Sequence, residues 1–170
     1  MLNKFKFDSK ASTLSKLKPI LKRSTILKIY SFNRERWNTN KNEIIKKIKT
    51  IFNGEVIVRS SAIDEDTTKK SQAGKYLSLS SINSKNTKKL NRSINKVFKS
   101  YKNNNLKNEV LIQPMLKNVS SSGVLFTYDN ETGSPYYCIE YDELTGFTDT
   151  VTAGSNDKSR TLYVLRSRYK

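Results

Sequence analysis

The chain has 170 residues, of which 35% are hydrophobic and 10% aromatic, enough to bury one large domain or two small lobes. It has no histidine and one cysteine, Cys138, which excludes imidazole-dependent triads, zinc sites of the usual ligands and a disulfide framework. The net charge is +17, but the cations are spread over nearly every predicted helix and loop. We therefore do not expect nucleic acid as the main partner, and we keep a basic nucleic-acid-binding module only as an alternative.

The sequence shows no membrane or export signal. No apolar run approaches the ~18 residues of a transmembrane helix, and residues 1–8 lack the apolar segment of a signal peptide. The lone Cys138 stands in the apolar run 136–139, where we expect a small buried side chain. A chain without paired cysteines fits a reducing compartment, so we expect a cytoplasmic protein without a membrane partner.

The first third of the chain has two clear helical patterns. Residues 9–18 predict a short helix that Ser9 or Ser12 caps and Pro19 disturbs. Residues 26–30 alternate enough to predict a strand, whereas residues 33–40 give no clear prediction. Residues 41–52 carry an apolar stripe of helical period and predict an amphipathic helix.

The rest of the chain is richer in strand patterns. A second apolar stripe of helical period predicts a helix over 87–101. Residues 62–74 are polar and predict a loop. Predicted strands occupy residues 55–59, 76–79, 110–113, 122–128, 136–141 and 161–166. Hairpins at this spacing favour an α+β fold with a mainly antiparallel sheet.

One stretch of the sequence suggests a binding site for phosphate. Residues 56–58 are an apolar, β-branched run that breaks abruptly into Arg59, Ser60 and Ser61, followed by acids. An arginine offers a planar fork of donors, and hydroxyl and backbone N–H groups add more, so the end of this strand could hold phosphate. A strand that simply ends in a charged turn remains the ordinary alternative.

Four motifs occur in a telling order: Val-Arg-Ser-Ser-Ala-x-x-Glu-Asp at 58–66, Ser-x-Ala-Gly at 71–74, Ile-Gln-Pro-Met at 112–115 and Ser-Gly-Val-Leu-Phe-Thr at 122–127. Together they resemble the N-terminal ATP-binding domain of the phosphoenolpyruvate synthase and pyruvate phosphate dikinase family, which has an ATP-grasp-like fold. The run 141–154 resembles a branch of that family among capsule enzymes, the L-glutamine kinases of capsular phosphoramidate synthesis.

The resemblance implies roles for individual residues. Lys10 matches a lysine that contacts ATP phosphates, although both flanking glycines of the family loop are missing. Arg59 matches a phosphate-clamping arginine with a catalytic role, and Ser60 beside it is a further candidate ligand of ATP. Gln113 and Met115 match the adenine hinge, where Pro114 should break the strand and leave backbone groups free for the adenine edge.

The resemblance also implies a domain plan and a reaction. Residues 1–109 should form the N-terminal lobe of the ATP-binding domain, and residues 110–170 its hinge and β-rich part. Because the chain ends straight after a predicted strand, we expect it to be incomplete at the C-terminus and inactive alone. The Mg²⁺ ligands and the phosphohistidine domain should lie outside it, with no metal ligands in the chain.

The complete enzyme should pass phosphoryl from ATP through that histidine to a small acceptor, the L-glutamine amide nitrogen, giving AMP and phosphate. A non-catalytic ATP-binding remnant is a further alternative to this function.

Overall fold

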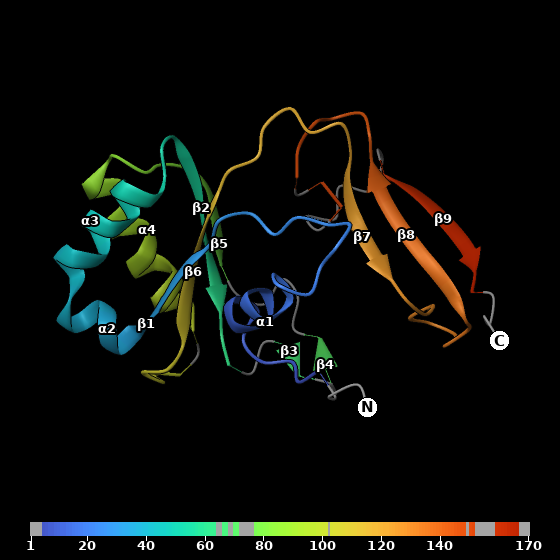
Figure 1. Cartoon of the computed structure of the whole chain (residues 1–170), viewed down its shortest axis with the longest axis horizontal. Coiled ribbons are helices and arrows are strands. Elements are labelled where there is room, and N and C mark those ends of the chain that lie inside the picture. Colours follow the sequence, from blue (N-terminus) through green and yellow to red (C-terminus); the bar gives the residue numbers. More distant parts are fainter. Residues whose placement is uncertain are drawn as a thin grey trace. The chain divides into compact units, whose positions relative to one another are not determined.

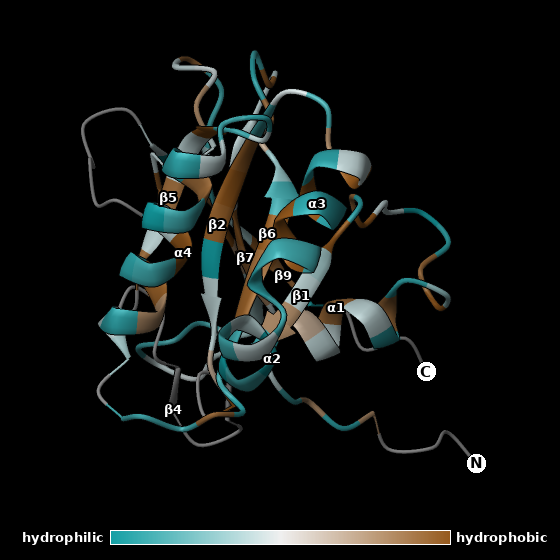
Figure 2. Cartoon of the chain, turned by 90° about the vertical axis from the view of Figure 1, so that its left-hand side faces the viewer, coloured by the Kyte–Doolittle hydropathy of each residue, from teal (hydrophilic) through white to brown (hydrophobic). Residues whose placement is uncertain are grey.

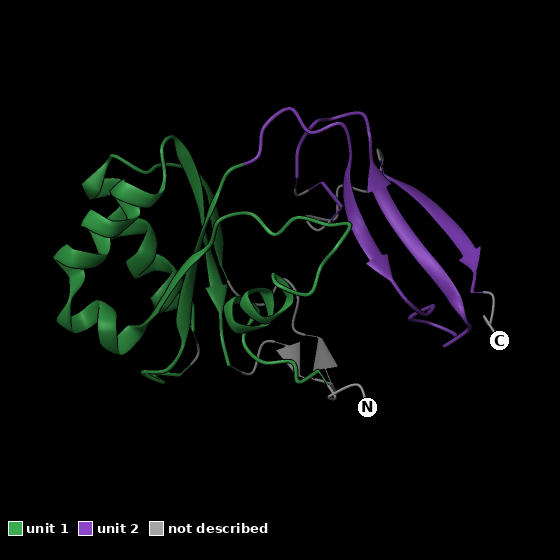
Figure 3. Cartoon of the chain, in the orientation of Figure 1, with its two compact units in different colours: residues 1–115 green, residues 116–170 purple. Residues whose placement is uncertain are grey.

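The chain forms two compact units, residues 1–115 and residues 116–170 (Figure 3). The computed structural model describes residues 5–63, 66–67, 70–71, 77–101, 103–148, 150–151 and 159–166. The expected motif at 71–74 lies outside these residues except for the backbone of Ser71, as do Ala153 and Gly154 at the end of the run 141–154. Each unit is described by itself below.

Unit 1 is built on a four-stranded antiparallel sheet in the order β1–β6–β2–β5. Helices α2, α3 and α4 cover one face of this sheet, and α1 lies against the other face (Figure 1). The strands are β1 (Tyr30–Asn33), β2 (Glu55–Ser61), β5 (Ser78–Asn83) and β6 (Glu109–Pro114), and the helices are α1 (Lys10–Leu17), α2 (Arg34–Thr39), α3 (Lys41–Ile51) and α4 (Thr87–Ser100). The α+β class with antiparallel sheets is confirmed.

The core of unit 1 lies between the sheet and the layer of α2, α3 and α4. Val56 and Val58 alternate along β2 toward this layer and are fully buried, as are Ile48 of α3 and Ile94 of α4. The helices turn their hydrophobic sides to the sheet and their hydrophilic sides outward (Figure 2). The two apolar stripes of the sequence are therefore confirmed as the inner faces of α3 and α4, because burying such a stripe is what stabilises a surface helix.

A tyrosine hydroxyl completes the ladder between β2 and β6 at one end. Ser61 and Glu109 are the last register partners of these strands. The Tyr101 hydroxyl accepts the Ser61 N–H at 2.8 Å and donates to the Glu109 carbonyl oxygen. Tyr101, which follows α4, thereby satisfies a buried donor and an acceptor at the point where β2 leaves the sheet.

Unit 2 is a three-stranded antiparallel sheet in the order β7 (Ser122–Phe126), β8 (Tyr136–Asp142) and β9 (Arg160–Leu165). Among its described residues the only buried side chains are those of Asp142 and Thr150, so this sheet has no apolar core there. Gly123 is required by close packing, since a Cβ atom there would lie 2.3 Å from the Glu140 carbonyl oxygen. The glycine of the motif at 122–127 thus lets β7 approach β8.

Several elements differ from the sequence-based expectation. The first strand begins at Tyr30 instead of covering 26–30, and α2 follows it at once, with Asn33 accepting the Arg36 N–H at 2.9 Å as its cap. Strand β5 is shifted to Ser78–Asn83 because an irregularity opposite β2, with Ser81 at a positive φ of 53°, disrupts simple alternation.

Two further differences concern the connection between β2 and β5 and the boundary between the two units. A short hairpin, β3 (Asp66–Thr67) and β4 (Lys70–Ser71), occurs within the expected loop 62–74. Strand β6 lies inside the unit 1 sheet, so the compact units divide after Met115, whereas the expected lobes divide after residue 109.

Within the described residues, no helix combines the length and apolar character needed to cross a membrane.

We predict that Tyr101→Phe destabilises unit 1 by about 1–3 kcal/mol, because it leaves the buried Ser61 N–H and the Glu109 carbonyl without their partner. Chemical denaturation monitored by circular dichroism measures the change. Tyr128→Phe is the matched control, since Tyr128 is exposed and should change the free energy of unfolding by less than about 0.5 kcal/mol. Equal stability of parent and Tyr101→Phe would contradict the assigned role.

Candidate functional site

Arg59 lies on the central strand of unit 1, on the face away from α3 and α4. Since Val58 points into the helical core, strand alternation places Arg59 on the opposite face. Gln113 of β6 lies on that same face as a diagonal neighbour of Arg59, because the direct partner of Arg59 is Leu111. The Arg59 Nη1 donates to the Gln113 Oε1 at 3.5 Å, a long hydrogen bond. The structure thus brings together two of the predicted site residues.

The Arg59 guanidinium has unused donor capacity. Its Nε atom is buried and has no hydrogen-bond partner within the described part of the chain. A buried donor on a charged group that lacks a partner is unfavourable, and such atoms are rare in folded proteins. A phosphate oxygen would satisfy this donor with a charge-assisted hydrogen bond. The arrangement can therefore hold an anionic group on this face of the sheet.

The N-terminus of α1 is held on the same face. Ser9, the N-cap of α1, donates its hydroxyl to Glu109 Oε2 at 2.6 Å. The Ala11 N–H donates to Ser61 Oγ at 2.9 Å. These two bonds fix Lys10, which stands between them in the sequence, near the end of β2 beyond Arg59. Lys10 is half-buried there, so the structure brings it to the same region of the sheet.

Ser60 points the other way. As the strand neighbour of Arg59 it projects from the helical face, and it is only 2% exposed. Its N–H donates to the Leu77 carbonyl oxygen at 3.2 Å. Ser61, in contrast, shares the face of Arg59. A role for Ser60 in binding ATP stays a prediction, and its side chain is not among the groups that the structure gathers beside Arg59.

The hinge geometry differs in one respect from the expectation. Gln113 and Met115 are both half-buried at the end of β6. The Met115 N–H donates to the Glu55 carbonyl oxygen at 2.9 Å, so this amide is not free for a ligand. Pairing with β1 ends at Ile112, and backbone groups alternate in direction along a strand. Beyond Ile112 it is therefore the carbonyl of Pro114 that faces the side of β1.

Tyr101, Ser61 and Glu109 were missed as residues that shape this site. The sequence offers a signal only for Ser61, which stands inside the Arg-Ser-Ser motif. In the sequence Tyr101 continues the apolar stripe of the predicted helix. No residue near it in the sequence indicates that its hydroxyl contacts β2 and β6. Such contacts are set by tertiary packing and leave no local pattern.

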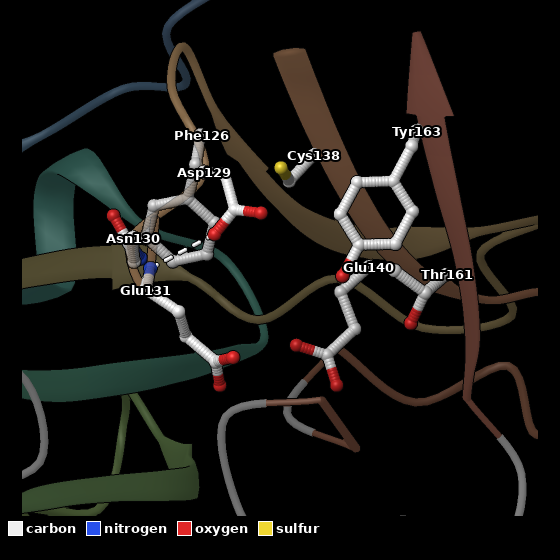
Figure 4. A pocket seen from close by; sticks show the side chains of 8 residues that line it. All are labelled: Phe126, Asp129, Asn130, Glu131, Cys138, Glu140, Thr161 and Tyr163. Carbon is white, nitrogen blue, oxygen red and sulfur yellow. Dashed lines mark hydrogen bonds between the residues drawn. The ribbon is translucent and has the colours of Figure 1, made fainter. Parts of the chain in front are cut away.

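Unit 2 contains a separate shallow hollow of about 230 Å³ on its sheet. Figure 4 shows residues of the turn after β7 on one side of it and strand residues on the other. The carboxylates of Asp129, Glu131 and Glu140 line it and disfavour a phosphate. Cys138 also lines it and is half-exposed, not buried as expected. Desolvation, followed by the charge of Asp129, raises the pKa of the Cys138 thiol, so this sulfur is a poor nucleophile.

Asp142 organises the run 141–154. Its buried carboxylate accepts the Leu144 N–H at 2.8 Å, the Thr145 N–H at 3.1 Å and the Thr145 hydroxyl. The Thr145 hydroxyl, followed by the Leu144 N–H, holds the pKa of Asp142 well below its usual range. The ionised Asp142 carboxylate thus stabilises the turn after β8. This structural role explains why an aspartate and a threonine stand three residues apart in the Asp-Glu-Leu-Thr segment.

The family profile of the AMP/ATP-binding domain of pyruvate phosphate dikinase matches residues 34–157, well over half of the chain. The chain belongs to this family. Among curated proteins, none matches the chain significantly. The match to the pyruvate phosphate dikinase domain includes Arg59, Ser60, Gln113 and Met115, whereas Lys10 precedes it.

Membership in the pyruvate phosphate dikinase family indicates which anion the face of unit 1 that carries Arg59 could hold, namely the phosphates of a nucleotide. The chain is an AMP/ATP-binding domain of the dikinase type, in a family of kinase-type phosphotransferases. A half-buried arginine whose buried Nε has no partner among the described residues, as found at Arg59, fits the phosphates of such a nucleotide. The described residues offer no comparable site for a metal ion, because they contain no group of three or more Cys, Asp and Glu side chains that could hold one.

We predict that Arg59→Ala lowers the affinity for ADP about tenfold to a hundredfold, since a hydrogen bond to a charged group contributes about 1.5–3 kcal/mol. Isothermal titration calorimetry measures the affinity, and thermal unfolding checks the fold. Arg36→Ala is the control, because the ion pair of the Arg36 side chain with Glu43 is exposed and lies on α2, away from the face that carries Arg59. If Arg59→Ala binds ADP as tightly as the parent, Arg59 is a structural residue.

We also predict that Asp142→Asn destabilises the chain at pH 7 but much less at low pH. The folded pKa of Asp142 is depressed, so its contribution is present above the unfolded pKa of about 3.9 and disappears as the pH falls further. Thermal unfolding of both proteins from pH 7 to pH 3 should show the gap begin to narrow below about pH 4, because the remainder is lost only as the pH falls through the depressed folded pKa. A gap that is independent of pH would exclude the assigned ionic role.

Proposed function

We propose that this chain forms part of the ATP site of a dikinase-type phosphotransferase. The observation that carries this proposal is the half-buried Arg59 on the central strand of the family-matched segment, with a buried Nε that lacks a partner within the described residues. Lys10, held beside the end of β2, adds a second cation on the same face. Two cations from neighbouring segments of one face would suit a polyphosphate chain.

In this proposal Arg59 contacts the transferring phosphates and stabilises their charge as it develops. Such preorganised donors are usually the largest contribution to catalysis of phosphoryl transfer. Gln113 orients the guanidinium through its side-chain oxygen. Met115 offers a soft apolar wall to the adenine ring, and the outward-facing carbonyl of Pro114 supplies an acceptor for its edge. Ser60 contributes through the backbone of β2, where its N–H donates to the Leu77 carbonyl and holds the strand next to Arg59 in place.

The phosphoryl group then passes to a histidine outside this chain, because the chain contains no histidine. The β- and γ-phosphates of ATP move to that histidine, water releases one phosphate, and the remaining phosphoryl joins the acceptor nitrogen, which loses a proton. We propose the amide nitrogen of L-glutamine as this acceptor, in capsule biosynthesis in the cytoplasm, with AMP and phosphate as the other products. The Mg²⁺ that assists this chemistry would be held by residues outside the chain.

We expect the 170-residue chain alone to bind ADP but to form no AMP from ATP and L-glutamine, because it lacks a phosphoryl-carrying histidine. The complete enzyme should form AMP with L-glutamine and not with pyruvate, the matched control acceptor. Chromatographic measurement of AMP, together with phosphorus NMR of the product, distinguishes these cases. AMP formation by the isolated chain would refute the proposal that the reaction needs a histidine outside it. Activity with pyruvate but not with L-glutamine would refute L-glutamine as the acceptor.

A further inference from the structure

The net positive charge of the chain is confined to unit 1. Residues 1–115 contain 26 Lys and Arg against 8 Asp and Glu, a net charge of +18, whereas residues 116–170 contain 6 against 7, a net charge of −1. A general bias toward lysine would raise the charge of both units. The charge is therefore concentrated, and its distribution over the surface of unit 1 becomes informative.

Helix α4 presents a straight row of cations. Lys88, Arg92, Lys96 and Lys99 stand at i, i+4, i+8 and i+11 of this helix and all are exposed. They share one side of the helix, opposite the buried stripe that contains Leu90, Ile94 and Val97. The hydrophilic outer side of α4 is visible in Figure 2. We call these four residues the α4 cation stripe, which extends about 16 Å along the helix axis.

The α4 cation stripe has no partner within the described residues. No hydrogen bond or ion pair there involves the side chains of its four members, and α4 contains no acidic residue. Neighbouring lysines behave differently, since the Lys85 ammonium donates to the Lys49 carbonyl at 2.6 Å and the Lys89 ammonium to the Ser81 carbonyl at 3.1 Å. The stripe is thus available to an external ligand.

Helix stability explains only Lys99 of the α4 cation stripe, which stands in the last turn, where the helix dipole favours a cation. Like charges four residues apart, as in Lys88 and Arg92 or Arg92 and Lys96, destabilise a helix. Lys88 also stands in the first turn, where a positive charge opposes the helix dipole and an acid would be favoured. A row that weakens its own helix is expected where it serves binding.

The surroundings of the stripe select the kind of ligand. Helix α3, in the same layer, adds the exposed Lys46 and Lys47. Among the described residues, neither α3 nor α4 exposes a large hydrophobic side chain that could enter a lipid surface or stack on a base. We propose that the outer face of α4 binds the phosphate backbone of nucleic acid independently of base sequence. A regular row of cations matches a regular row of phosphates, and backbone contacts carry no sequence information.

This surface is distinct from the proposed nucleotide site. The α4 cation stripe lies on the helical layer of unit 1, whereas Arg59 projects from the other face of the sheet. Binding of nucleic acid should therefore survive Arg59→Ala. Because the two surfaces are separate, nucleic-acid binding by α4 can be tested whether or not Arg59 binds ATP.

The test compares two variants that each replace three lysines and one arginine by glutamine. The stripe variant carries Lys88→Gln, Arg92→Gln, Lys96→Gln and Lys99→Gln. The control variant carries Lys18→Gln, Lys22→Gln, Arg23→Gln and Lys28→Gln, which are exposed and precede the sheet. Fluorescence anisotropy with labelled DNA duplexes of about 20 base pairs and unrelated sequences gives the affinity between about 50 and 200 mM salt.

The stripe variant should lose at least tenfold in affinity for every duplex, and its slope of log affinity against log salt should be shallower by about 3–4. The control variant and Arg59→Ala should lose less than about threefold, because they keep the stripe and its phosphate contacts. The thermal midpoint of the stripe variant should equal or exceed that of the parent, since like-charge repulsion is removed.

Three results would overturn the proposal. The first is equal loss of affinity in the stripe and control variants, which would indicate only diffuse attraction by net charge. The second is a parent protein that binds no duplex at about 100 mM salt. The third is stripe-dependent binding to phosphatidylglycerol vesicles without binding to duplexes, which would assign the surface to a membrane.

Discussion

The structure of unit 1 depends on the central position of β2. Because β6 and β5 pair with its two edges, the side chains of β2 can only alternate between the helical core and the opposite face. Val56 and Val58 fill the core, and this commits Arg59 to the other side. A guanidinium in a half-buried place needs polar partners, and the sheet supplies one, Gln113, while a second donor atom is left for a ligand. The candidate site thus follows from strand alternation.

The other contacts of unit 1 fix the end of this strand. The Tyr101 hydroxyl closes the ladder at Ser61 and Glu109, and the Ser61 side chain in turn accepts the Ala11 N–H of α1. Helix α4 on one face and helix α1 on the other are therefore linked through a single residue at the end of β2. Such a linkage holds the arginine and the neighbouring Lys10 segment in place before a nucleotide arrives, which reduces the entropy lost on binding.

Patterns that repeat along the chain were predictable, and contacts between distant residues were not. The stripes of α3 and α4 and strand β6 were found because burial imposes a period on the sequence. Strands β7, β8 and β9 were found from runs of β-prone residues between turn signals, since their side chains are mostly exposed. Helix α2 was missed because only Trp37 of its six residues is buried, although the cap at Asn33 was a usable signal. For the site, the Arg-Ser-Ser motif located Arg59, yet neither the direction of Ser60 nor the bond of the Met115 N–H to Glu55 could be read from it. The cation stripe was not predicted, because the sequence does not show which lysines are engaged, as Lys89 is by the Ser81 carbonyl, and which are not.

The open sheet of unit 2 has a practical consequence for work with the isolated chain. Strand β9 is one of the two edge strands of that sheet, and all six of its residues are exposed. Four apolar or aromatic residues follow one another along it, Leu162, Tyr163, Val164 and Leu165. An exposed apolar edge strand presents unpaired backbone groups that another chain can join, and proteins usually protect such edges with charge or proline. Here Arg160 begins the strand and Arg166 follows it, with no charge between them. Aggregation of the chain at high concentration should therefore proceed through β9, and a lysine in place of Tyr163 or Val164 would improve solubility without touching unit 1.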